Sequence, residues 1–120
     1  MDESISLHVL CRMKGITPQG VTQIEKGQYQ SVSWRFHAGH IPGLIGRPIC
    51  FHEVKSKPSY FGGTITRIDR EPVADNDGDV RSIVYFISDG TGTGLKWAGN
   101  QQSREVFHVN KSVPVAELKP

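Results

Sequence analysis

The sequence predicts a small α+β domain, a β-barrel of five to seven short strands with one or two short helices. Three observations favour this fold class. The chain has 120 residues, which is the usual size of one domain, so residues 1–120 are expected to form a single unit. Several segments alternate apolar and polar residues with the period of two that is typical of half-buried strands. The 13 glycines separate these segments and indicate many turns.

The first strand is predicted over Ser4–Arg12. Its apolar residues occupy alternate positions, at Ile5, Leu7, Val9 and Cys11. Alternate residues of a strand share one face, so these four side chains are expected to point into the core.

A short helix is predicted next, over Pro18–Lys26. Thr17 offers an N-cap, Pro18 suits the first helical position, and Gly27 suits the residue just past a helix end. Val21 and Ile24 are expected to face inward.

The second strand is predicted over Gln28–Phe36. Alternation places Val32 and Trp34 on one face, where they are expected to fill the core, and Tyr29, Ser31 and Ser33 on the other. The following segment, residues 37–48, contains three glycines and two prolines, which predicts a loop with one helical turn at Ile41–Ile45.

The stretch Gly46–Asp69 concentrates the potential site chemistry. It reads as a strand over Ile49–His52, a basic loop over Glu53–Ser59, and a strand over Thr64–Ile68 that opens at Tyr60. The adjacent pair Gly62–Gly63 marks a bulge, or a point that another backbone or a ligand approaches closely.

The remaining chain predicts two more strands with their connections. The segments are an acidic hairpin turn over Glu71–Val80, a strand over Arg81–Ser88, a flexible connection over Asp89–Gly94, a last strand over Glu105–Val109, and a surface strap over Val113–Pro120.

Composition limits the class of function. The net charge of +2 permits nucleic-acid binding without the strongly basic balance that would announce it. Cys11 and Cys50 lie in apolar strand contexts without CxxC spacing, so both are expected to be reduced core thiols. The sequence shows no signal-peptide pattern and no long apolar span, so a cytoplasmic location is expected.

Three motifs favour ordinary loop structure over a bound ion. The acidic run Asp75–Asp79 lacks the flanking helices and the spacing of a calcium loop. The run Gly90–Gly94 lacks the Lys-Ser/Thr pair of a phosphate-binding loop. His37 and His40, with His52 and Glu53, have no zinc-ligand spacing. No cofactor and no metal are expected.

Part of the chain resembles the PUA-like superfamily. The resemblance lies in a short helix ending in Ile-x-x-Gly, a strand with a Trp, then Gly-x-x-Ile-x-Phe-His-x-x-x-Lys and Gly-Gly-x-Ile, in order over Thr17–Asp69. The ASCH and EVE/YTH branches are most similar. The resemblance implies a PUA-like β-barrel that binds nucleic acid or a nucleobase.

The ASCH resemblance also allows a test for catalysis. ASCH-type domains carry Gly-x-Lys-x-x-Glu-x-Arg after the first helix, and the Lys and Glu belong to the catalytic set of the amidohydrolase branch. Aligned on Gly27, this chain has Tyr29, Val32 and Trp34 at the three charged positions. Because Val32 cannot exchange a proton, the alignment favours a binding module over an enzyme.

The predicted function is therefore recognition of nucleic acid (DNA or RNA) or of a nucleotide-like ligand, including a modified or flipped-out base. Aromatic, hydroxyl, cationic and glycine positions are the predicted ligand-binding residues: Tyr29, Ser31, Ser33, His52, Lys55, Lys57, Tyr60, Gly62, Gly63, Lys96 and Trp97.

Two other classes of function stay open. One is a small ASCH-type nucleobase hydrolase that uses His52, Tyr60 and a carboxylate such as Glu53. The other is a protein-interaction subunit, a homodimer formed through the sheet at Arg81–Ser88. Neither class requires a membrane.

Overall fold

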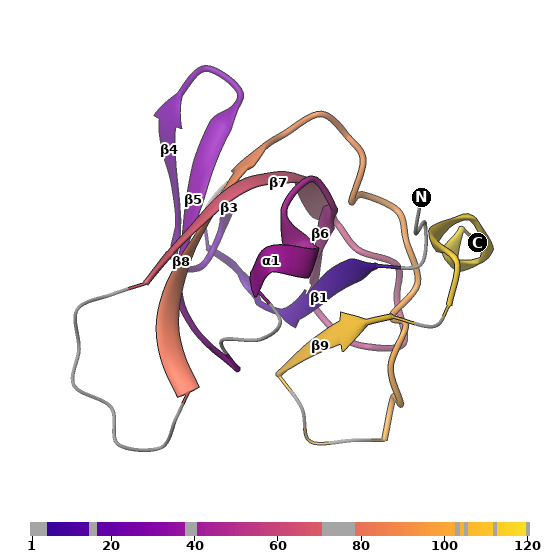
Figure 1. Cartoon of the computed structure of the whole chain (residues 1–120). Coiled ribbons are helices and arrows are strands. Elements are labelled where there is room, and N and C mark those ends of the chain that lie inside the picture. The colour runs from indigo at the N-terminus through magenta and orange to yellow at the C-terminus, as the bar shows by residue number, and fades with distance from the viewer. Residues whose placement is uncertain are drawn as a thin grey trace.

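A computed structural model gives the structure of residues 5–14, 17–37, 41–70, 79–102, 104, 106–111 and 113–119. The strands are β1 (Ser6–Leu10), β2 (Met13–Lys14), β3 (Thr17–Pro18), β4 (Val21–Glu25), β5 (Gln28–His37), β6 (Pro48–His52), β7 (Phe61–Arg70), β8 (Asp79–Ile87) and β9 (Phe107–Asn110). One helical turn, α1 (Ile41–Leu44), precedes β6, and a 3-10 turn, η2 (Val115–Leu118), follows β9 (Figure 1).

Seven strands form one sheet, in the order β4-β5-β8-β7-β6-β1-β9, while β2 and β3 form a separate hairpin. β1 pairs with β6 in parallel, and the other neighbouring strands of the large sheet are antiparallel. β4 and β9 are the two ends of the sheet and do not pair with each other. The predicted barrel is therefore wrong in its closure, and helix is limited in the described residues to α1 and η2.

The predicted helix over Pro18–Lys26 is also wrong. The segment contains β3, a turn and β4, and β4 forms a hairpin with β5. Gly20 and Gly27 have φ of 80° and 78°, a conformation that glycine adopts without steric cost. Two turn glycines on either side of Val21–Glu25 produce a sequence pattern that also fits a capped helix. The segment forms a strand because it pairs with β5.

Other predicted elements agree with the structure. The strands predicted over Ser4–Arg12, Gln28–Phe36, Ile49–His52, Thr64–Ile68 and Arg81–Ser88 correspond to β1, β5, β6, β7 and β8, and the helical turn at Ile41–Ile45 corresponds to α1. The last strand begins two residues later than predicted. Residues 71–78, the greater part of the predicted acidic turn, lie outside the described residues.

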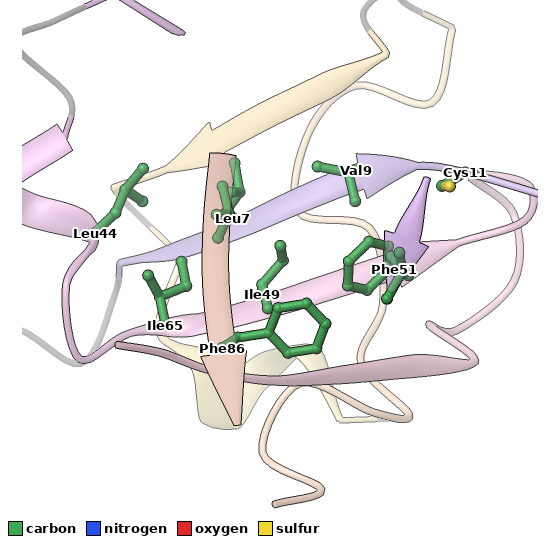
Figure 2. Close-up of a cluster of buried hydrophobic side chains, with 10 residues drawn as sticks. Leu7, Val9, Cys11, Leu44, Ile49, Phe51, Ile65 and Phe86 are labelled. Carbon is green, nitrogen blue, oxygen red and sulfur yellow. The ribbon is translucent and has the colours of Figure 1, made fainter. Parts of the chain in front are cut away.

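The main core lies against one face of the sheet (Figure 2). It contains Leu7, Val9, Cys11, Val21, Leu44, Ile49, Phe51, Ile65, Val84 and Phe86. The predicted inward positions of the first strand are confirmed, because Leu7 and Val9 are fully buried there and Ile5 packs at the edge. Cys11 and Cys50 are both free and buried, as predicted.

The opposite face of the sheet differs between its two halves. Over β1, β6 and β9 it is covered by residues 92–97, which we call the covering segment, and by η2. Together they bury Cys50 with Leu95 and Leu118. Over β4, β5, β8 and β7 the outward side chains keep part of their surface exposed. We call these two regions the covered face and the open face.

No helix in the described part of the chain is long and apolar enough to cross a membrane.

Candidate functional site: a buried histidine network and an open sheet face

The covered face contains two histidines that the strand pairing brings together. His8 on β1 and His52 on β6 lie on neighbouring parallel strands, and both are 0% exposed. Alternation sends Leu7 and Val9 into the main core, so His8 must point to the covered face.

A chain of side-chain hydrogen bonds runs through this pair. His8 Nδ1 lies 2.9 Å from His52 Nε2, and His8 Nε2 lies 2.9 Å from Ser6 Oγ. Asn110 Nδ2 donates to Ser6 Oγ at 3.0 Å, and His52 Nδ1 lies 3.2 Å from the Lys57 carbonyl oxygen. We call Ser6, His8, His52 and Asn110 the histidine network.

The network has one consistent direction of donation. The Lys57 carbonyl can only accept, so His52 Nδ1 carries the proton and His52 Nε2 accepts from His8 Nδ1–H. His8 Nε2 then accepts from the Ser6 hydroxyl, whose oxygen accepts from Asn110. With both imidazoles neutral, every polar side-chain atom of the histidine network has a hydrogen-bond partner, as buried polar atoms require.

The pKa values of both imidazoles agree with this assignment. Burial lowers the pKa of His8 to about 3, and the electrostatic influence of the neighbouring His52 and His108 rings lowers it further. Burial also lowers the pKa of His52, and this effect outweighs the hydrogen bond to the Lys57 carbonyl, which raises the pKa. Because an imidazolium would cost both desolvation and an accepted hydrogen bond, the network is uncharged at neutral pH.

Trp97 closes the network from the covering segment. Its ring meets His8 and His52 edge-on, with ring centroids 5.9 Å and 5.2 Å away, and the residue is 5% exposed. Lys55 Nζ lies 5.1 Å from the centroid of the Trp97 ring, within the range of a cation–π contact. Trp97 Nε1 has no hydrogen-bond partner among the described residues.

Asn110 also joins the network to the C-terminal segment. It donates to the Val113 carbonyl at 2.8 Å and accepts from the Val113 amide at 3.0 Å. Beyond Val113, Leu118 is buried against Cys50, and its carbonyl accepts from Lys96 N at 2.7 Å. The surface strap predicted over Val113–Pro120 is thus a cover for β6, and residue 120 lies outside the described part.

The structure brings together three of the predicted ligand-binding residues: His52, Lys55 and Trp97. However, the side chains of His52 and Trp97 are buried. Lys57 and Lys96 are exposed. The Tyr60 hydroxyl donates to the Cys11 carbonyl, and burial raises the pKa of this phenol.

The glycine pair is explained by close backbone contacts. A Cβ on Gly62 would overlap the backbone of Ile49 and of Gly92 in the covering segment, and one on Gly63 would overlap the Ile87 carbonyl. The close backbone approach that the sequence predicts is therefore confirmed. Ser59 strengthens the contact by donating to the Gly92 carbonyl at 2.6 Å, so the connection predicted as flexible is bonded to the loop before β7.

The first part of β5 faces the opposite way from its prediction. The Tyr29 ring stacks on Phe86 at 5.7 Å and meets Phe61 edge-on at 5.4 Å, next to the main core, and Ser31 is buried. The register of β5 against β8 shifts between Ser31 and Trp34, and such a bulge interrupts the alternation that the prediction assumed. The side chains of Val32, Ser33 and Trp34 lie outside the described part.

The open face presents a row of unlike groups across four strands. Thr22, Gln30, Tyr85 and Arg67 are opposite one another on β4, β5, β8 and β7, and directly opposed residues share a face. The Arg67 guanidinium carbon lies 4.1 Å from the centroid of the Tyr85 ring. Arg67 also pairs with Asp69 at 3.2 Å, and its side chain stays 62% exposed.

Sequence reasoning missed the partners of His52 and this row. His8 lies between Leu7 and Val9 on a strand that is buried on both faces. A histidine at such a position is a signal that could have identified it from the sequence. Ser6 and Asn110 give no local indication, because they lie 104 positions apart. Tyr85 is one of the aromatic residues of the strand predicted over Arg81–Ser88, yet its partner Arg67 depends on the β7–β8 register.

No group of three or more metal-ligating side chains occurs among the described residues, and the side chains of His37 and His40 lie outside them. Comparison of the chain with family models, characterised proteins and solved structures gives no match. The PUA-like resemblance therefore stays a prediction.

Proposed function

We propose that this protein binds single-stranded nucleic acid, or a nucleotide-like ligand with an unstacked base, through its open face. The observation that carries the proposal is the stack of the Arg67 guanidinium on the Tyr85 ring. Aromatic rings and guanidinium planes are the surfaces on which proteins stack single-stranded bases. Because the Arg67 side chain is 62% exposed, a base can stack on its outer side.

The neighbours of this stack suit recognition of base edges. Gln30 offers an amide and Thr22 a hydroxyl in the same row, and Gln28 lies in the next row beside Ile87, which is 36% exposed. Amides and hydroxyls can donate and accept at once, so they can bind the edge of a stacked base. A modified or flipped-out base would use the same contacts.

The histidine network supports binding over hydrolysis. A general base must reach the proton that it abstracts, whereas both ring nitrogens of His52 are bonded within the protein and the residue is 0% exposed. The phenol of Tyr60 is likewise engaged with a backbone carbonyl. Two of the three groups expected to form a hydrolase site, His52 and Tyr60, therefore have structural partners.

The interaction-subunit alternative loses its simplest geometry. β8 pairs with β5 on one side and with β7 on the other, so it has no free edge for a second chain. A homodimer through this region would have to use the open face itself, and would compete with the proposed ligand.

Fluorescence anisotropy with labelled poly-dT and poly-U oligonucleotides tests the proposal. Arg67→Ala and Tyr85→Ala should each weaken binding by about tenfold, since stacking one base is worth about 1–3 kcal/mol. Lys111→Ala, which removes an exposed cation beyond β9, is the matched control and should change affinity little. Equal affinities in all three variants would remove the open face from the interface.

A salt titration separates the contribution of the basic loop. If Lys55 and Lys57 also contact phosphate, the double variant Lys55→Ala/Lys57→Ala should flatten the dependence of affinity on salt. An unchanged slope would exclude the loop while leaving the open face as the site.

A further inference from the structure

A pocket of about 280 Å³ shares no lining residue with the histidine network or with the row of side chains on the open face. It forms where η2 passes the start of β6 and the residue before β1. Its walls are aliphatic and its charged groups are cationic: Ile5, Pro48, Val115 and Ala116, with Arg47 and Lys119.

Both cations are attached to fixed backbone. The Arg47 amide donates to the Leu44 carbonyl at 3.0 Å, and the Arg47 carbonyl accepts from the Ile65 amide at 2.8 Å. Lys119 directly follows Leu118, whose side chain is buried and whose carbonyl is bonded to Lys96. The backbone thus holds both residues at the pocket before any ligand arrives.

The charged side chains among the described lining residues of this pocket are both cationic. Among the described residues, no acidic side chain lines the pocket, and neither Arg47 nor Lys119 forms an ion pair. Glu117 is on the same 3-10 turn but does not line the pocket. An anionic group would therefore meet two cations among the described residues of the lining.

We propose that this pocket binds a small carboxylate with an aliphatic body. The planar guanidinium of Arg47 matches the two oxygens of a carboxylate, and Lys119 adds a second charge. Ile5, Pro48 and Val115 provide the apolar surface for the body. The lining contains no aromatic ring, so the pocket lacks the stacking surface that a nucleobase would require.

Such a ligand would bridge two parts of the fold. Arg47 and Pro48 belong to the start of β6, whereas Val115 and Lys119 belong to the C-terminal segment that covers β6. Because a ligand that binds only the folded state stabilises it, a bound ligand would stabilise the packing of the C-terminal segment against β6.

Calorimetric titration with sodium octanoate tests the proposal, with acetate and octanol as matched probes. Octanoate should bind saturably, and at least about tenfold more tightly than either probe, since acetate lacks the body and octanol the charge. Arg47→Gln and Lys119→Gln should each weaken octanoate binding about tenfold. The control Lys111→Gln should leave it unchanged.

Three results would overturn the proposal. They are no saturable binding of octanoate, octanol affinity equal to that of octanoate, or unchanged affinity in Arg47→Gln. Ala116→Leu, which adds apolar volume at the pocket wall, provides a second variant without loss of charge and should also reduce octanoate binding. Tyr85→Ala should not affect octanoate, which keeps this site independent of the open face.

Discussion

The two halves of the sheet use the same strand geometry for opposite purposes. β1 and β6 are buried on both faces, whereas β7 and β8 bury one face and expose the other. The histidines on β1 and β6 have the greater chemical capacity, but their atoms are all used inside the protein. By contrast, Tyr85 on β8 and Arg67 on β7 keep part of their side-chain surface exposed to solvent. Exposure, more than residue type, therefore distinguishes the side chains of the two halves that are accessible to a ligand.

A glycine contact marks the boundary between the halves. The covering segment reaches the sheet where Gly92 passes Gly62, and neither residue has space for a Cβ. If this contact is what allows the cover to form, a single methyl group there should remove the difference between the two faces.

The largest expected effect is therefore that of Gly62→Ala. The new Cβ would overlap the Ile49 carbonyl oxygen and would lie 2.6 Å from the Gly92 carbonyl carbon. Both atoms belong to the backbone and cannot move aside at low cost. We expect a loss of several kcal/mol, comparable with the most severe single substitutions, measured by urea unfolding. Gly43→Ala is the control, because its Cβ would meet only Ile5 Cδ1 at 3.9 Å. Equal stability of the two variants would show that the contact is not needed.

The pH dependence of stability should report the histidine network. The pKa of His8 is lowered to about 3 in the folded protein and is about 6.5 in an unfolded chain. The unfolded chain therefore takes up the proton first as pH falls. The contribution of neutral His8 to the free energy of unfolding is therefore complete above about pH 6.5. It is lost progressively toward pH 3, by about 2 kcal/mol between pH 6.5 and 4.5.

The variant His8→Asn separates this contribution from other acid effects. It cannot titrate in this range, so its free energy of unfolding should fall less steeply between pH 6.5 and 4.5, although it starts from a lower value. Chemical unfolding at several pH values measures both slopes. Parallel slopes would mean that His8 is not the group that takes up the proton.

The sequence predicts the strands well where the pattern is local. β1 and β8 carry alternation or β-branched residues, and β6 carries a short apolar run, so each can be recognised without knowledge of its neighbours. β4 was missed because Thr17-Pro18 and Gly27 fit a capped helix and a pair of turns equally. The face of Tyr29 was wrong because a bulge later in β5 cannot be seen in the pattern.

The sites are less predictable than the strands, for a physical reason. The sequence indicates His52 and Trp97 as residues of interest, but their environment depends on contacts between distant positions. His8 and His52 are 44 positions apart, and the bond from Asn110 to Ser6 spans 104. Only the parallel pairing of β1 with β6, together with the return of β9, makes the network and its cover.

The smallest expected effect is on the stability of the open face. Arg67 contacts Tyr85 and Asp69 near solvent, and exposed ion pairs and cation–π contacts are each worth about 1 kcal/mol or less. Arg67→Ala should therefore lower the free energy of unfolding by less than about 1 kcal/mol while weakening oligonucleotide binding about tenfold. Arg67→Lys keeps the charge but loses the plane. If stacking is the basis of recognition, Arg67→Lys should bind nearly as poorly as Arg67→Ala; if charge alone matters, it should bind like the parent protein, and the open face would be an electrostatic surface without base recognition.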